Sequence, residues 1–284
     1  MVPTSAMSAY VIGDPGRAAA EVGAGVPVRR PWCPDIVADA TDVPGLTVRA
    51  ASTRGVLHRK YGTPRQDSYS LSWQHDSTEL FVTVCDGVGS LEMSQDAAEW
   101  VTLRMAEAVR RDESGILDWQ AAFTTLSAEL AELAAVRGPM ATTVVSACVT
   151  PVDNRFQAEI AWVGDSAAYL LGPVGWEVVG GSVKAADPDG APLVTTTLAL
   201  PSRVVEAQTA VVEFGCDTAL FLMTDGLADP LGAGAGEVGH TLASWWAIPP
   251  DPFTLAAQAA FARRSFDDDR TVVGVWPATG AQAQ

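Results

Sequence analysis

Histidine and cysteine are scarce in this sequence, which has three histidines and four cysteines among 284 residues. The cysteines, at positions 33, 85, 148 and 216, form neither a C-x-x-C pair nor the close spacing of a disulfide framework. Cys85 and Cys148 lie inside apolar, strand-like runs, as reduced core thiols do. We therefore expect a cytoplasmic protein without a zinc or copper site, because such sites need a cluster of these two residue types.

Basic residues are also few. The chain has 18 lysines and arginines against 34 aspartates and glutamates, which gives a formal net charge of -16. Phosphate backbones repel such a surface, so the composition disfavours nucleic-acid binding. No apolar run approaches the roughly 20 residues needed to cross a bilayer, and the N-terminus lacks the features of a signal peptide. We expect a monomer with no nucleic-acid partner and no membrane association.

Apolar residues make up 48% of the chain, which is enough to form the core of one large domain. Residues 1–45 differ from the rest, because they repeat Gly, Pro and Ala without a sustained period. This composition predicts a flexible or loosely docked N-terminal tail. We expect one folded domain over residues 46–277 and a short C-terminal tail over residues 278–284.

Strand-like runs dominate the predicted domain. They follow one another as hairpins do, and two adjacent helices interrupt them, which favours an α+β sandwich over a doubly wound parallel sheet. The predicted strands are 46–53, 67–73, 79–85, 142–150, 157–163, 167–172, 210–214, 218–224 and 270–276, and the predicted helices are 94–111, 119–136 and 251–264.

Acidic residues stand at the ends of several predicted strands. Asp67 starts one strand and Asp86 ends the next, and the segment QHDSTE between Trp73 and Leu80 reads as a hairpin loop. Pairing Trp73 with Leu80 places Asp67 opposite Asp86. Two carboxylates that face each other across an antiparallel ladder repel each other unless a cation or a proton lies between them. This register therefore predicts a counter-charge.

The same pattern recurs later in the chain. TALFLMTDG ends on Asp225 and Gly226, and AEIAWVGDS leads to Asp165. The last strand is preceded by three aspartates, residues 267–269, which an antiparallel placement would bring to the same edge. One Asp-Gly after a strand is most often only a turn, but the consistent polarity of the whole set favours a shared site. Clustered carboxylates suit Mg²⁺ or Mn²⁺.

Six segments carry a resemblance to a known family. GTPRQDSYSL, VCDGVGS, MATTVVSACV, WVGDSAAYLL, LMTDGLAD and DDDRTVVGVW occur in the order and rough spacing of the motifs of the metal-dependent protein phosphatase 2C family, over residues 46–276. The Gln-Asp pair in GTPRQDS, with His58 upstream, most resembles a bacterial subgroup, and the acidic, tailed chain is similar to actinobacterial proteins.

The resemblance implies a β-sandwich of two antiparallel sheets flanked by helices, with a dinuclear Mn²⁺ or Mg²⁺ centre at one end. It implies hydrolysis of phosphoserine or phosphothreonine in a protein substrate by water that the ions activate. Carried over by position, Asp86 would bridge both ions and Gly87 would offer its carbonyl, while Asp67, Asp225 and Asp268 would complete the shells and Asp165 would help to hold a weaker third ion.

The sequence departs from the family where phosphate should bind. The usual arginine lies five residues before the first-motif aspartate, and Gly62 stands there. Among the basic residues nearby, Arg59 is favoured over Lys60 because a guanidinium clamps a phosphoryl group through two hydrogen bonds. Arg65 is a further candidate, unless it belongs to a structural ion pair. His58 is either an acid that donates to the leaving group or the phosphate, or a surface residue.

Gln66 replaces the usual acid of the first motif and removes a negative charge from beside the predicted metals. Two functions remain open. The surviving metal aspartates favour a cytoplasmic serine/threonine phosphoprotein phosphatase. The altered first motif and the missing arginine leave a pseudophosphatase, or a regulatory binding module that retains the fold and the metal site, as the alternative.

Overall fold

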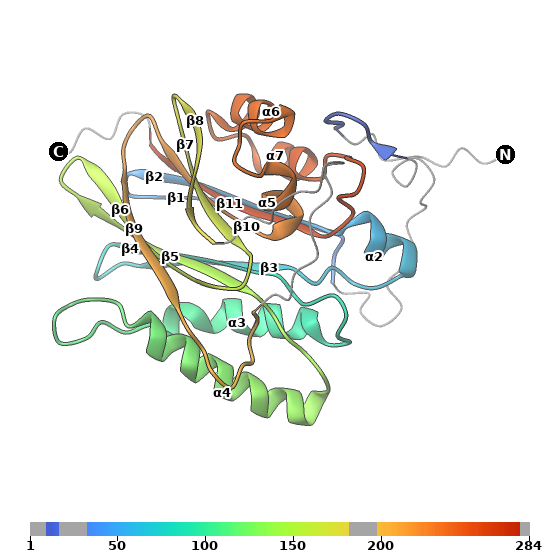
Figure 1. Cartoon of the computed structure of the whole chain (residues 1–284). Helices are drawn as coiled ribbons and strands as arrows, with labels where there is room; N and C mark the ends of the chain where they lie inside the picture. The colour runs from blue at the N-terminus through green and yellow to red at the C-terminus, as the bar shows by residue number, and fades with distance from the viewer. Residues whose placement is uncertain (1–9, 17–32, 182–197, 279–284) are drawn as a thin grey trace.

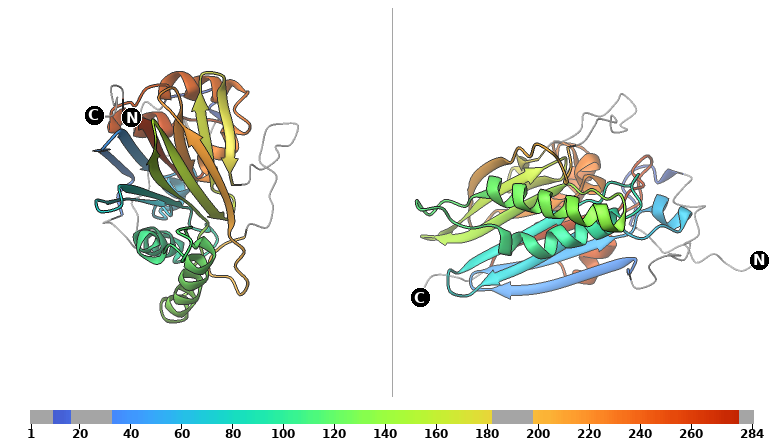
Figure 2. Two further views of the ribbon diagram at one scale, coloured as in Figure 1. Left: turned by 90° about the vertical axis from the view of Figure 1, so that its left-hand side faces the viewer. Right: turned by 90° about the horizontal axis from the view of Figure 1, so that it is seen from below.

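The computed structural model describes residues 10–16, 33–181 and 198–278. Two antiparallel sheets face each other, and helices cover their outer faces (Figure 1). One sheet has six strands in the order β1-β2-β11-β10-β7-β8, and the other has five in the order β3-β4-β5-β6-β9. The two layers of strands between their helices are also visible in Figure 2. The predicted β-sandwich is confirmed.

The strands are β1 (Ile36–Val43), β2 (Leu46–Thr53), β3 (Ser68–Gln74), β4 (Glu79–Cys85), β5 (Val144–Val152), β6 (Arg155–Val163), β7 (Ala167–Gly172), β8 (Gly175–Gly180), β9 (Gln208–Phe214), β10 (Ala219–Met223) and β11 (Arg270–Pro277). The helices are α2 (Val56–Tyr61), α3 (Ser94–Ala108), α4 (Trp119–Arg137), α5 (Asp225–Leu231), α6 (Glu237–Trp246) and α7 (Pro252–Ala259). Helices α3 and α4 cover the five-stranded sheet, and α5, α6 and α7 cover the six-stranded one (Figure 1).

Strand β4 contributes side chains to two separate cores. Its alternate side chains point to opposite faces. Leu80, Val82 and Val84 enter the core between the sheets, whereas Phe81 and Cys85 pack in the core under α3 and α4. Every residue of β4 is therefore buried, which explains why ELFVTVC shows no strict alternation of apolar and polar residues.

The folded part begins earlier than the predicted boundary after residue 45. Strand β1 pairs along its whole length with β2, from Ile36 opposite Thr53 to Val43 opposite Leu46. Its sequence, IVADATDV, lies at a sheet edge, is only partly buried and has two aspartates, so its intrinsic strand signal is weak. Residues 10–16 are also in contact with the domain. Of the predicted C-terminal tail, only residue 278 is described.

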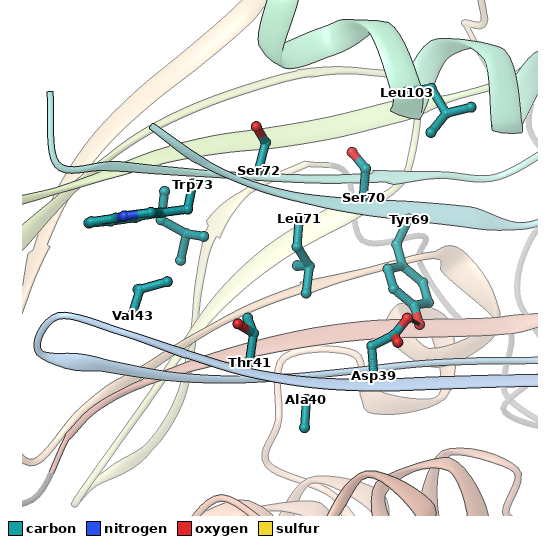
Figure 3. Close-up of a pocket in the computed structure, with 11 residues that line it drawn as sticks. Asp39, Ala40, Thr41, Val43, Tyr69, Ser70, Leu71, Ser72, Trp73 and Leu103 are labelled. Carbon is teal, nitrogen blue, oxygen red and sulfur yellow. Dashed lines mark hydrogen bonds between the residues drawn. The ribbon is translucent and has the colours of Figure 1, made fainter. Parts of the chain in front are cut away.

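Strands β1 and β3 are the edge strands of the two sheets on one side of the molecule, and a groove with a cavity of about 440 Å³ lies between them (Figure 3). The Tyr69 hydroxyl donates a 2.6 Å hydrogen bond to Asp39 across this groove. The residues that line it do not include the strand-end aspartates that the sequence singles out. Within the described ranges, no helix is long and apolar enough to span a membrane.

Candidate metal centre

The β3–β4 hairpin has the register that the sequence predicts. Trp73 pairs with Leu80, and Ser68 pairs with Cys85. Asp67 therefore enters β3 at the point where Asp86 leaves β4, and the two carboxylates come from adjacent ends of one ladder.

Asp67 is almost fully buried and is fixed by two threonines. Its Oδ2 accepts 2.8 Å hydrogen bonds from the hydroxyls of Thr224 and Thr271. Burial, with the charges of Asp269 and Asp268, raises the pKa of Asp67 well above its usual value, although the threonine hydrogen bonds oppose this shift. Because both hydrogen bonds go to Oδ2, they fix the orientation of the carboxylate and leave its other oxygen, Oδ1, out of these two contacts.

Asp86, Asp165 and Asp225 converge from three strand ends. One carboxylate oxygen of each lies within 4.8 Å of the others. Burial raises the pKa of Asp86 well above its usual value, and the charges of Asp225, Asp67, Asp268 and Asp165 raise it further. Like charges at this separation need a cation or a proton to stay together.

The last acidic run divides into two roles. Both oxygens of Asp269 are engaged, since Oδ1 accepts a 2.6 Å hydrogen bond from the Gly55 amide and Oδ2 accepts one of 2.5 Å from the Gln66 amide. Asp268 keeps a solvent-accessible face, while desolvation and the charges of Asp225 and Asp269 raise its pKa to about 6. Oδ1 of Asp268 accepts a 2.8 Å hydrogen bond from the Asp269 amide, so its other oxygen, Oδ2, is the one available to a cation, while Asp269 fixes the backbone beside it.

Glycines allow the close approach of these strand ends. A Cβ on Gly87 would lie 2.7 Å from the Ser94 carbonyl oxygen and 2.8 Å from that of Gln66. A Cβ on Gly226 would lie only 1.9 Å from the carbonyl oxygen of Asp269. Real Cβ atoms do not come so close to backbone, so the Asp-Gly pairs are packing requirements as well as turns.

The predicted catalytic residue His58 lies on α2 beside the acids. Its Nδ1 is 2.8 Å from Oδ1 of Asp269. Burial opposes its charge, but the contact with Asp269 and the charges of Asp269, Asp268 and Asp67 outweigh burial and raise the pKa of His58 to about 9. A Cβ built on Gly89 would lie 3.9 Å from the other ring nitrogen, Nε2. The ring therefore reaches the loop that follows Asp86.

Arg65 and Arg59 have different surroundings. Arg65 is buried, donates a 2.6 Å hydrogen bond to Ser52 Oγ and a 3.3 Å one to the Pro34 carbonyl, and also donates to the carbonyl of Asp67. Within the part of the chain that the structure describes, the hydrogen-bond partners of this guanidinium are neutral groups rather than an acid, and they hold the backbone where it enters β3. Arg59 is partly exposed, and its Nε lies 4.0 Å from Asp35. Burial lowers the pKa of Arg59, partly offset by the charge of Asp35.

Gln66 is 5% exposed, and its Oε1 accepts no hydrogen bond from the described residues. A Cβ on Gly89 would lie 3.4 Å from this oxygen, so Gln66 and His58 approach the same loop. Thr224 and Thr271 are not among the site residues predicted from the sequence. The signal that could have found them is their position, one residue before Asp225 and two residues after Asp269.

Two sheets packed between helices, with carboxylates converging from their strand ends, define a phosphatase-like sandwich with an acidic metal-site cluster. The family model of protein phosphatase 2C matches residues 54–251. The chain belongs to the protein phosphatase 2C family. The predicted class, a metal-dependent serine/threonine protein phosphatase, is confirmed, and the pseudophosphatase alternative is not favoured.

Solved structures share the fold at low sequence identity. A bacterial serine phosphatase has a TM-score of 0.62 at 16% identity, covering 81% of this chain and 97% of its own. The catalytic domain of the serine/threonine protein phosphatase PstP, in complex with two manganese ions, has a TM-score of 0.57 at 19% identity, with the same coverage of 81% and 97%. RsbX in complex with magnesium has a TM-score of 0.51 at 12% identity, covering 85% and 100%. Curated protein sequences give no significant match.

Proposed function

We propose that the chain hydrolyses phosphoserine and phosphothreonine in proteins with two Mn²⁺ or Mg²⁺ ions held by its strand-end acids. The observation that carries the proposal is the convergence of Asp86, Asp165 and Asp225 within 4.8 Å. The proposed ligands of the ion pair are Asp67, Asp86, the Gly87 carbonyl, Asp225 and Asp268, and Asp165 is proposed to help hold a third, weaker ion.

The residues present fit hard divalent cations. Every proposed donor is an oxygen, as Mg²⁺ and Mn²⁺ prefer. The raised pKa of Asp86 reflects burial and repulsion by the neighbouring carboxylates, and bound cations would relieve both. When bound, two such ions activate water for attack on phosphorus and neutralise charge on the phosphoryl group.

The protein orients these donors before any ion binds. Thr224 and Thr271 fix one oxygen of Asp67. The amide of Thr143 and the hydroxyl of Thr142 donate 2.8 Å hydrogen bonds to the carbonyl of Asp86, and so fix the turn from β4 into Gly87. Such supporting hydrogen bonds set ligand geometry and tune metal affinity.

We propose that α2 supplies the phosphate contacts that Gly62 does not. His58 is held by Asp269, and its Nε2 side reaches the loop after Asp86. Arg59 makes a long, 4.0 Å contact with Asp35, so it could turn toward a phosphoryl group at small cost. Arg65 donates hydrogen bonds to Ser52 and to the carbonyl of Asp67, and we propose that it positions Asp67 rather than binding phosphate.

We also propose a cytoplasmic location, because Cys85 and Cys148 are fully buried thiols that form no disulfide with a described residue. We propose in addition that the chain is a monomer. Light scattering of the purified chain and fractionation of cells that express it would test this assignment.

The main test uses the full chain after chelation of metals, with p-nitrophenyl phosphate and phosphoserine and phosphothreonine peptides as substrates. Activity should be absent without metal and return with Mn²⁺ or Mg²⁺, and calorimetry should show two bound ions. Asp42→Asn, which changes an exposed acid outside the cluster, is the matched control for Asp86→Asn. Two bound ions without turnover would instead support the binding module, and activity insensitive to chelation would contradict the metal assignment.

A further inference from the structure

The N-terminal segment, residues 10–16, is docked on the loop that leads to Asp268. The amide of Ala262 donates a 2.7 Å hydrogen bond to the Tyr10 carbonyl, and the amide of Ile12 donates a 3.3 Å one to the Ala262 carbonyl. Val11 and Ala262 form a parallel bridge. In Figure 1 this dark blue segment runs beside the red-orange loop that follows α7.

Side chains anchor the segment as well. Ile12 is 3% exposed and belongs to the core cluster under α5, α6 and α7. The ring of Tyr10 packs edge-on against Trp245, with 5.0 Å between the ring centroids. Asp14 pairs with Arg264 at 3.2 Å, and its carbonyl accepts a 2.8 Å hydrogen bond from the Arg264 amide. The segment is thus held by apolar contacts of Tyr10 and Ile12 and by polar contacts between Asp14 and Arg264.

The loop that receives the segment, residues 260–266, is held from inside by Arg270. This buried guanidinium donates to the carbonyls of Ala259, at 3.2 Å, and of Phe266, at 2.8 Å, and also to that of Phe261. Ser265 has a φ of 70°, a left-handed conformation that is unfavourable for a non-glycine residue. A strained turn of this kind persists only where its surroundings fix it.

The strained turn immediately precedes the acidic run. The N-terminal segment contacts the loop at Ala262 and Arg264, before Ser265. Arg270 contacts it both before Ser265, at Ala259 and Phe261, and after Ser265, at Phe266. Asp268 follows Phe266 by two residues. Release of the segment would remove its contacts with Ala262 and Arg264, and the residues that precede Asp268 would then be less constrained.

We infer that residues 10–16 position the Asp268 ligand, so that their docking and metal binding are coupled. This inference rests on the proposed function, which makes Asp268 a metal ligand. Because coupling between two sites is reciprocal, release of the segment should weaken metal binding, and bound metal should hold the segment in place.

The first test is Mn²⁺ calorimetry on full-length Ile12→Ala, with Arg264→Ala as a second variant that leaves the core intact. Coupling of typical size would weaken Mn²⁺ binding by about 5-fold or more in Ile12→Ala. Leu130→Ala, which truncates a fully buried residue of α4 in the other helical layer, is the matched control, and it should lower thermal stability without changing Mn²⁺ affinity.

The second test needs no destabilising variant. Hydrogen exchange at the Ile12 and Ala262 amides should slow in wild type when Mn²⁺ is added, and this response should be reduced in Asp268→Asn. Unchanged exchange at both amides in metal-saturated wild type would overturn the inference, as would equal Mn²⁺ affinity in Ile12→Ala and wild type. If Asp268→Asn itself binds Mn²⁺ as wild type does, the proposed metal ligand fails, and this result is distinct from failure of the coupling.

Discussion

The hydroxyl of Thr271 donates a 2.8 Å hydrogen bond to Oδ2 of Asp67, across 204 residues of sequence. It joins the entry of β3 in one sheet to the start of β11 in the other. Asp67, the first proposed metal ligand in the chain, is thereby oriented by β11, the strand that follows Asp268, the last proposed ligand. The packing of the two sheets therefore sets the geometry of the metal centre.

Thr271→Val should loosen Asp67 without removing a proposed ligand. Loss of a hydrogen bond that orients a metal ligand typically costs about 10- to 100-fold in metal affinity or activity. We expect a change of this size in the Mn²⁺ dissociation constant by calorimetry. Thr209→Val on the exposed face of β9 makes the same chemical change away from the site, and should bind Mn²⁺ as wild type does. Equal binding by both variants would show that the Thr271–Asp67 contact is not needed.

Asp86→Asn should abolish hydrolysis, weaken Mn²⁺ binding and stabilise the metal-free protein. The folded-state pKa of Asp86 is raised above its ordinary value of 3.8, so its ionised form is unfavourable in the fold. Its contribution to stability is fully present below the unfolded-state pKa and is lost as the pH rises through the raised pKa.

The advantage of Asp86→Asn over wild type in metal-free thermal unfolding should therefore grow as the pH rises above 3.8. Saturating Mn²⁺ should reverse the order of the two proteins, because it stabilises the form that binds it. A wild type that is more stable than the variant in chelator at neutral pH would contradict this reasoning.

Asp268→Asn and Asp269→Asn should have different defects. The first should lose Mn²⁺ affinity and activity, as Asp86→Asn does. The second should mainly lose stability, by about 1–3 kcal/mol, because an amide in place of Asp269 turns a donor toward the backbone amide of Gly55 or Gln66. Calorimetry and thermal unfolding of both variants separate these outcomes. A larger loss of Mn²⁺ affinity in Asp269→Asn would mean that the roles in the acidic run are exchanged.

The phosphate contact can be located with alanine variants of His58, Arg59, Lys60 and Arg65. Loss of a charge-assisted hydrogen bond, worth roughly 1.5–3 kcal/mol, lowers kcat/KM by about 10- to 100-fold. We expect this loss in His58→Ala and Arg59→Ala with Mn²⁺ affinity nearly unchanged, and a smaller one in Lys60→Ala.

Arg65→Ala should instead lower the unfolding temperature, since it leaves Ser52 and two backbone carbonyls without their donor. Full activity in both His58→Ala and Arg59→Ala would show that α2 does not contact the phosphate.

Much of the fold was predictable because its signals are local. Strands β2, β4 and β7 have the predicted bounds, and the helical periods of α3 and α4 predict those helices to within a few residues. The pairing of Trp73 with Leu80 followed from the length of one hairpin loop. Elements whose stability comes from neighbours were missed, such as β1 at the sheet edge and α5, which contains Pro230.

The sequence by itself determined that acids end several strands, and that the register of one hairpin brings Asp67 and Asp86 together. Local periodicity and loop length are enough for both conclusions. Only the tertiary structure showed that both oxygens of Asp269 accept hydrogen bonds from the backbone amides of Gly55 and Gln66. The same holds for Arg65, whose charge suggested phosphate and whose partners are Ser52 and backbone carbonyls. These outcomes depend on contacts between strands far apart in the chain, which no local pattern encodes.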